Sequence, residues 1–285
     1  MTKKLLAVLF AFVLFASACS DSDSGDGADG SSSSSSTEST ESTQSTDADA
    51  DAAEPIRVMV TNDDGVDAEG IDALVEALDT RDDVEVVVIA PDVNKSGSGG
   101  KTTPGPLAAT DSTTASGHPA TAVDGFPADT VIYAIDQEGL DFDLVISGIN
   151  DGQNIAQVVD ISGTVGAARQ AAQLGVPALA TSQGFGDPPD FPTAVGLVMN
   201  WLDDNIDAVR AGTLGTDMVS NLNVPTCPDG EIQGLVEVPV SEVDGDINAV
   251  DCTGDGAPVD DLTGFTNGWA TLSQLAPTGS RTTDD

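Results

Sequence analysis

Apolar residues in this chain fall into short runs separated by segments of helical spacing. Residues 56–61 and 84–90 are compact apolar runs, and residues 68–78 between them repeat apolar side chains every three or four positions. Short apolar runs are typical of buried strands, and the wider spacing predicts a helix. A strand, a helix and a second strand joined by short links predict a βαβ unit, and hence a parallel sheet.

The alternation continues toward the C-terminus. We expect further strands at residues 120–123, 144–147, 176–181, 218–224 and 232–240, and helices at residues 127–135, 163–174 and 191–209. Residues 91–117 are rich in Gly, Ser, Thr and Pro, which predicts a long loop or irregular hairpins. Residues 56–285 therefore suit one α/β domain with a mostly parallel sheet, or such a domain with a small appendage.

The first 55 residues have a different composition. Two lysines precede the apolar residues 5–18, a segment of signal-peptide length that is short for a membrane span. Small residues then lead directly to Cys19, which resembles a bacterial lipobox with an acylated cysteine; ordinary cleavage after Ala18 is the alternative. Residues 19–55 are acidic and serine-rich with no aromatic residue, which predicts a disordered tether. We expect a signal peptide at 1–18 and an extracytoplasmic lipoprotein anchored to the membrane, or else a secreted protein.

The charge of the chain limits its possible binding partners. The chain has 48 acidic and 9 basic residues for a net charge of -39; 38 acidic and 7 basic residues, net -31, follow residue 55. Nucleic-acid binding needs clustered Lys and Arg, so we expect no nucleic-acid partner. Dense carboxylates are typical of proteins in salty surroundings, and a cation-collecting surface is a compatible alternative.

Cys227 and Cys252 form an even pair once Cys19 is set aside. Export favours a disulfide between them, and two free thiols are the alternative.

Polar loops that carry glycine follow several predicted strands. Because the carboxyl ends of parallel strands share one edge of a sheet, where ligands bind, these loops should converge. The residues grouped in this way are Asp63, Asp64, Asn94, Ser96, Asn150 and 162–164. Adjacent carboxylates repel unless a cation lies between them, and a hard divalent metal fits; a simple Asn-Asp-Asp-Gly turn explains the same residues equally well.

Three further features bear on the chemistry. Residues 162–164 open a predicted helix, where backbone N–H groups bind anions, although Ser162 alone is better explained as an N-cap. Lys95 is one of few bases and suits a phosphate contact, unless it is simply an exposed loop residue. His118 is the single histidine, and its polar loop predicts a solvent-facing side chain, which argues against histidine-based nucleophilic catalysis. The chain lacks a GxSxG elbow, a P-loop and a GxGxxG turn.

Four motifs in order resemble the SurE family of metal-dependent 5′/3′-nucleotidases. They are Thr-Asn-Asp-Asp-Gly at 61–65, Ala-Pro-Asp-Val-Asn-Lys-Ser-Gly at 90–97, the segment 145–154 that contains Gly-Ile-Asn-Asp-Gly, and Ser-Gly-Thr-Val at 162–165. Their order and spacing agree over residues 56–181, and residues 221–225 also resemble the family. The resemblance implies a Rossmann-like three-layer fold and hydrolysis of nucleoside monophosphates with Mg²⁺ or Mn²⁺.

The resemblance also assigns roles to particular residues. It implies that Asp63, Asp64, Ser96 and Asn150 bind the metal, that Asn94, Lys95, Ser162, Gly163 and Thr164 contact phosphate, and that Asp63, Asp64 and Asn94 are catalytic. It further implies a homodimer formed through an arm within residues 215–285. The chain departs from the family at Lys95, where arginine is usual, at Phe126 and at Ile161, which affects substrate preference. The alternatives are a non-catalytic lipoprotein that binds metal or nucleotide, and a broader phosphatase acting on polyphosphate or sugar phosphates.

Overall fold

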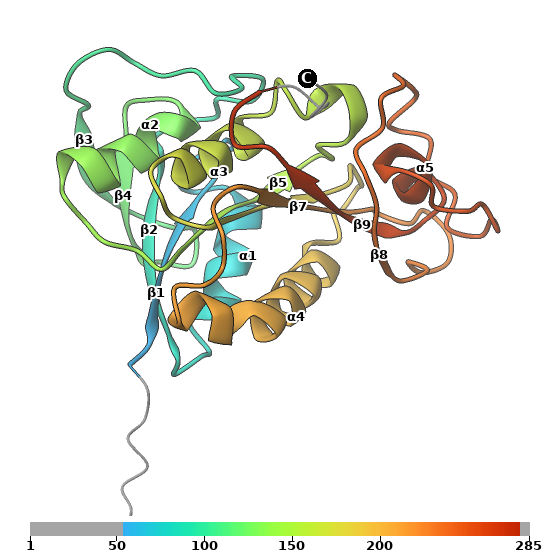
Figure 1. Cartoon of the computed structure of the whole chain (residues 1–285), viewed down its shortest axis with the longest axis horizontal. Helices are drawn as coiled ribbons and strands as arrows, with labels where there is room; N and C mark the ends of the chain where they lie inside the picture. The colour runs from blue at the N-terminus through green and yellow to red at the C-terminus, as the bar shows by residue number, and fades with distance from the viewer. Residues whose placement is uncertain (1–53, 280–285) are drawn as a thin grey trace, which may run out of the picture. The chain divides into compact units, whose positions relative to one another are not determined.

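The structure, a computed structural model, describes residues 54–279 (Figure 1). The predicted signal peptide, the predicted acylation site Cys19 and nearly all of the predicted tether lie outside these residues. The strands are β1 (Ile56–Thr61), β2 (Val84–Pro91), β3 (Ala109–Thr113), β4 (Pro119–Val123), β5 (Leu144–Asp151), β6 (Ala178–Gln183), β7 (Val219–Val224), β8 (Leu235–Glu237) and β9 (Ala270–Leu275). The α-helices are α1 (Glu69–Leu78), α2 (Pro127–Ile132), α3 (Gly163–Gln173), α4 (Phe191–Arg210) and α5 (Asp261–Thr266).

Within residues 54–279 the strands form one nine-stranded sheet in the order β3-β4-β2-β1-β5-β6-β7-β9-β8. The six strands from β4 to β7 in this order run parallel, whereas β3 and β9 are antiparallel to β4 and β7. The chain fills one side of β1 with β2 to β4 and then crosses to the other side with β5. The predicted α/β fold with a mostly parallel sheet is confirmed, and β1 and β5 flank the point where the strand order reverses.

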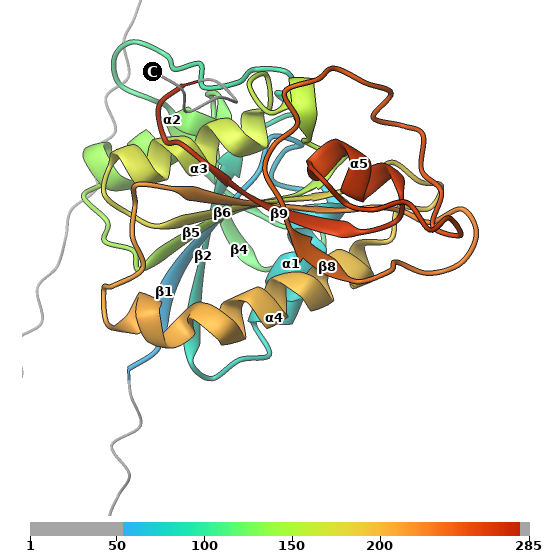
Figure 2. The same cartoon turned by 45° about the vertical axis from the view of Figure 1, so that its right-hand side comes forward.

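Helices cover both faces of the sheet (Figure 2). α1 and α4 lie on one face, where Leu74 and Leu202 pack with Val58 and Val60 of β1. α2 and α3 lie on the other face, where Val165 packs in the same cluster as Met59. Because successive side chains of a strand point to opposite faces, the continuous apolar run of β1 contributes to both cores.

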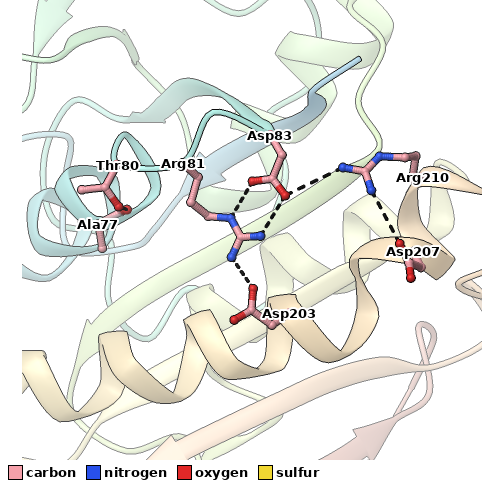
Figure 3. Close-up of polar contacts among 7 residues, drawn as sticks. All are labelled: Ala77, Thr80, Arg81, Asp83, Asp203, Asp207 and Arg210. Atoms are coloured by element: carbon pink, nitrogen blue, oxygen red, sulfur yellow. Dashed lines mark hydrogen bonds and ion pairs between the residues drawn. The ribbon is translucent and has the colours of Figure 1, made fainter. Parts of the chain in front are cut away.

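A cluster of charged side chains connects α4 with the loop between α1 and β2 (Figure 3). Arg81 Nε donates to Asp83 Oδ1 at 2.8 Å, and Arg81 Nη1 also pairs with Asp203 of α4. Arg210 lies between Asp83, at 3.8 Å, and Asp207, at 3.6 Å. Two of the seven bases after residue 55 therefore hold α4 against the first βαβ unit.

The structure differs from the predicted elements in several places. The segment 91–117 contains β3, which pairs with β4, so the hairpin alternative is correct there. β5 extends past the predicted 144–147 to Asp151, and the predicted strand 232–240 shrinks to the three residues of β8. The helix predicted at 127–135 is α2 followed by a π-helical segment, Tyr133–Gln137. α5 was not predicted, because a six-residue helix is too short for periodicity to reveal. β9 was also not predicted, because its sequence Ala-Thr-Leu-Ser-Gln-Leu has only two large apolar residues and no continuous apolar run.

The C-terminal part folds onto the same sheet. β9 pairs with β7 from Val219↔Leu275 to Asn223↔Thr271, so the described part of the segment 215–285 completes the chain's own sheet. A disulfide joins Cys227, after β7, to Cys252, with 5.7 Å between their Cα atoms. Among residues 54–279, no helix is both long enough and apolar enough to span a membrane.

Candidate functional site

The polar loops converge at the carboxyl ends of β1 and β5, the point of strand-order reversal. β1 and β5 pair in parallel up to Thr61↔Ser147, so the residues just beyond these positions lie side by side. A cavity of about 190 Å³ opens there, lined among others by Asp63, Ser96 and Asn150. Ligands of open parallel α/β sheets bind at such a crevice.

Asp63 is buried, with 3% of its surface exposed, and is held from several sides. Thr164 Oγ1 donates to Asp63 Oδ1 at 2.6 Å, and backbone groups of Gly163 and Thr164 at the start of α3 also hydrogen-bond to this carboxyl. Burial raises the pKa of Asp63, and these hydrogen bonds offset the rise only in part. The N-terminus of α3 therefore binds an anion that belongs to the protein itself.

Gly163 permits this close approach. A Cβ atom at position 163 would lie 2.7 Å from Asp63 Cβ and 2.8 Å from Ser98 Oγ, which is too close for any other residue. Ser98 Oγ is buried, and no residue of the described chain hydrogen-bonds to it. The glycine in the Ser-Gly-Thr motif is thus explained by packing of α3 against the carboxylate.

Asp64 accepts two hydrogen bonds across the site. Asn94 Nδ2 donates to Asp64 Oδ1 at 2.9 Å, and the backbone N–H of Asp151 donates to Oδ2 at 2.9 Å. Burial, together with the charges of Asp63 and Asp151, raises the pKa of Asp64 to about 6. The ionised form of Asp64 is therefore less stable here than in water, and a bound cation would stabilise it.

Asn150 and Ser96 add uncharged oxygens to the same cavity. The pairing of β5 with β6 shifts register between Ser147 and Asn150, and such an irregularity re-aims the side chains that follow it. Asn150 Nδ2 donates to the Gly152 carbonyl at 2.6 Å, which leaves the amide oxygen Oδ1 as its remaining acceptor atom. Asn94 Oδ1 accepts from the Ser96 backbone N–H at 3.0 Å and so holds the loop at the cavity.

This donor set fits a hard divalent cation. None of the ion pairs within residues 54–279 involves Asp63 or Asp64, although Asp63 is buried and Asp64 is partly buried. The described part of the chain contains no cluster of three or more Asp, Glu, His or Cys side chains that would bind a metal alone. Two carboxylates completed by hydroxyl and amide oxygens leave positions for water and substrate, as Mg²⁺ and Mn²⁺ sites do.

Comparison with known proteins agrees with this architecture. The model of the family described as "Survival protein SurE" matches residues 58–243. The chain belongs to the SurE family. It is 36% identical over 192 residues to a 5′-nucleotidase SurE of Brevibacillus brevis, covering 65% of this chain and 72% of that protein. It is 39% identical over 198 residues to the 5′-nucleotidase SurE of Halobacterium salinarum, covering 66% and 71%. The crystal structure of the SurE protein from Aquifex aeolicus matches with a TM-score of 0.64 at 27% identity, covering 79% of this chain and 94% of that one.

Several of the predicted phosphate contacts have hydrogen-bond or ion-pair partners within the protein, and Ser162 also lines the cavity that contains Asp63. The Lys95 ammonium is 3.5 Å from Asp92 Oδ1, so it pairs with a neighbouring carboxylate. Ser162 Oγ accepts from Val165 N at 3.1 Å and is the N-cap of α3, and the Thr164 hydroxyl is bound to Asp63. His118 is also not free in solvent, because its Nδ1 lies 2.7 Å from Asp79 Oδ2. Each of these groups therefore has at least one partner within the protein. The predicted roles of Lys95, Ser162 and Thr164 in phosphate binding stay predictions.

Sequence reasoning missed the buried amide network behind the SurE site. Asn154 N donates to Asn223 Oδ1 at 2.7 Å, and Asn154 Nδ2 donates to Ser182 Oγ at 2.8 Å. Asn221 Nδ2 donates to the Asn154 backbone carbonyl at 3.0 Å. The alternating asparagines of β7 were the available signal, because buried polar side chains on a central strand require partners. This network fixes the loop that follows Asn150.

Proposed function

We propose that this chain is a divalent-metal-dependent 5′-nucleotidase that hydrolyses nucleoside monophosphates to nucleoside and phosphate. The observation that carries the proposal is the carboxylate pair at the point of strand-order reversal: Asp63 is buried and lines one cavity with Ser96 and Asn150, and the adjacent Asp64 is partly buried. The SurE relatives from Brevibacillus brevis and Halobacterium salinarum are named 5′-nucleotidases, which supports the same activity. Nucleotide is therefore the substrate class, and the reaction is hydrolysis of a phosphate monoester.

Asp63, Asp64, Ser96 and Asn150 would hold Mg²⁺ or Mn²⁺. A bound divalent metal supplies Lewis-acid polarisation of phosphoryl oxygens and lowers the pKa of bound water. The hard oxygen donors of this set favour these ions over metals that prefer thiolate or imidazole ligands. The choice between the two ions is not encoded in the donor types and needs measurement by metal add-back.

The protein's own residues orient these donors. Thr164 and the N-terminus of α3 hold Asp63, while Asn94 and the Asp151 backbone hold Asp64. Such supporting hydrogen bonds fix a ligand's orientation, and their loss typically costs 10–100-fold in metal affinity or activity. Asn94, predicted as catalytic and phosphate-binding, is in this arrangement a positioning residue for Asp64. In the overall reaction water adds to phosphorus, and the ester oxygen leaves with a proton as the nucleoside hydroxyl.

Metal depletion and one substitution test the proposal. We expect the full chain to release phosphate from AMP with Mg²⁺ or Mn²⁺, to lose this activity in EDTA, and to regain it on metal add-back. Asp64→Asn should lower the rate at least about 100-fold, whereas Asp67→Asn, which removes the same charge from an exposed neighbour, should retain it. Full activity in EDTA, or an active Asp64→Asn, would sink the proposal.

We also propose that Cys19 is acylated and that the protein is an extracytoplasmic lipoprotein. The apolar segment 5–18, the small residues before Cys19 and the polar composition that follows support this. In a bacterial host, wild type should partition into detergent and Cys19→Ser into the aqueous phase; equal partitioning contradicts the lipid anchor. A homodimer remains a prediction, which light scattering would test.

A further inference from the structure

We propose that Phe185 is a stacking platform for the nucleobase, so that this site selects nucleoside monophosphates over phosphate esters that lack a base. The inference rests on the proposed nucleotidase function and specifies how that site recognises its substrate. It assigns specificity to the loop after β6 and to the disulfide-linked segment opposite.

Phe185 is exposed to an unusual degree for an aromatic residue. Its exposed fraction is 61%. Among residues 54–279, seven large apolar side chains are exposed, and Phe185 is the one aromatic residue of this set. Ile161, 57% exposed, lines the same cavity. Exposed apolar side chains gathered at one cavity, on a domain of net charge -31, are characteristic of a binding surface.

The ring lies between two cavities. The first, of about 190 Å³, contains Asp63, Ser96 and Asn150, and the second, of about 590 Å³, is lined by Asn248 and Val250; Phe185 lines both. A monoester with its phosphate at the carboxylates therefore extends toward Phe185 at its other end. The second cavity gives room for a base against the ring.

Hydrogen bonds hold the platform in place. The Phe185 backbone N–H donates to Gln153 Oε1 at 3.2 Å, and the ring packs on Gly152, where a Cβ atom would lie 2.5 Å from Phe185 Cζ. Gln153 Nε2 in turn donates to the Ile247 carbonyl at 2.8 Å and to Asn248 Oδ1 at 3.0 Å. One glutamine thus joins the aromatic residue to the opposite wall. A rigid aromatic platform loses little entropy when a base stacks on it.

The opposite wall is itself tethered. Gln157 Nε2 donates to the Gly245 carbonyl at 2.9 Å, and the disulfide Cys227–Cys252 anchors the segment beyond Asn248. Asn248 Oδ1 accepts from Gln153, which leaves the side-chain NH₂ group of Asn248 as the donor for a base. Aromatic stacking flanked by an amide donor is the chemistry that proteins use for flipped or single-stranded bases.

Two substrates that differ only in the base test the inference. AMP and ribose 5-phosphate share the reacting ester, so the ratio of their kcat/KM values isolates recognition of the base. We expect the wild type to have the higher kcat/KM for AMP. Phe185→Ala should lower kcat/KM for AMP roughly tenfold and leave the value for ribose 5-phosphate unchanged, because stacking on the ring supplies most of the preference. Phe185→Tyr should restore the preference. Val259→Ala, which truncates an exposed apolar side chain outside both cavities, should leave it unchanged.

The outcomes separate this inference from the proposed function. An unchanged ratio in Phe185→Ala, an equal loss on both esters, or a wild type without preference for AMP overturns the platform. A wild type that hydrolyses neither ester in Mg²⁺ or Mn²⁺ overturns the nucleotidase function instead. Calorimetric titration with AMP then still decides the platform: affinity roughly tenfold weaker in Phe185→Ala supports it, and equal affinity refutes it.

Discussion

The hydrogen bond from Thr164 to Asp63 should be a main support of the ligand-free site. Thr164→Val keeps the side-chain shape and deletes the hydroxyl that donates to Asp63 Oδ1 at 2.6 Å. The two residues are 101 positions apart in the sequence. Thr164 is fully buried and Asp63 is 3% exposed, so water cannot replace the donor. Asn154 Nδ2 loses only a long contact of 3.4 Å and retains its bond to Ser182.

The expected loss is about 1.5–3 kcal/mol of unfolding free energy, the usual contribution of a hydrogen bond to a charged group. For a domain of this size each kcal/mol lowers Tm by roughly 2–4 °C, so the shift should be roughly 3–12 °C. Differential scanning calorimetry in EDTA measures the shift with no bound metal to compensate for the lost hydrogen bond.

Thr193→Val is the matched control. Thr193 Oγ1 donates to Asp190 Oδ2 at the same 2.6 Å, but this pair is only partly buried at the start of α4. Its loss should cost about 0.5 kcal/mol, since water can solvate the carboxylate. Equal shifts for the two variants would refute the reasoning from burial. An unchanged Tm in Thr164→Val with a raised KM for AMP would instead restore Thr164 as a phosphate contact.

Other consequences follow from charge and cross-linking. Burial raises the pKa of Asp64 from 3.8 to about 6. The protonated carboxyl of Asp64 therefore stabilises the folded protein below pH 3.8, and this stabilisation is lost as pH rises through 6. In EDTA the free energy of unfolding of Asp64→Asn, relative to that of wild type, should therefore rise by about 1–2 kcal/mol between pH 4 and pH 8, after discounting for the partial hydration of Asp64. Denaturant titrations measure this difference, and a difference that does not change with pH contradicts the expectation. Arg81→Met should cost about 1 kcal/mol, more than Arg57→Met, because Arg81 is less exposed and pairs with two carboxylates; equal shifts in Tm would argue otherwise. Reducing Cys227–Cys252, which spans 25 positions, should cost about 3 kcal/mol by chain entropy, and an unaltered Tm would exclude that role.

Much of the fold follows from local pattern. The apolar run of β1, the helical spacing of α1 and the second run of β2 predict a βαβ unit because burial of regularly spaced side chains drives each element. The parallel sheet in turn places Asp63 and Asp64 at its ligand-binding edge. Local pattern failed where elements are short or irregular, as in β8 and α5, whose residues are ordered by neighbours distant in sequence.

The sheet, the carboxylate pair and the family motifs could be predicted from the chain alone, since they depend on residue type and local spacing. The partner of each polar group could be read only from the folded protein: Thr164 donates to Asp63, Lys95 pairs with Asp92, and Gln153 joins Phe185 to the segment around Asn248. Local periodicity carries no information about such contacts, because packing of distant segments brings the groups within hydrogen-bonding distance. Residue types thus indicated the chemistry of the site, whereas the contact between Phe185 and the segment around Asn248, on which the proposed base recognition rests, was visible only in the fold.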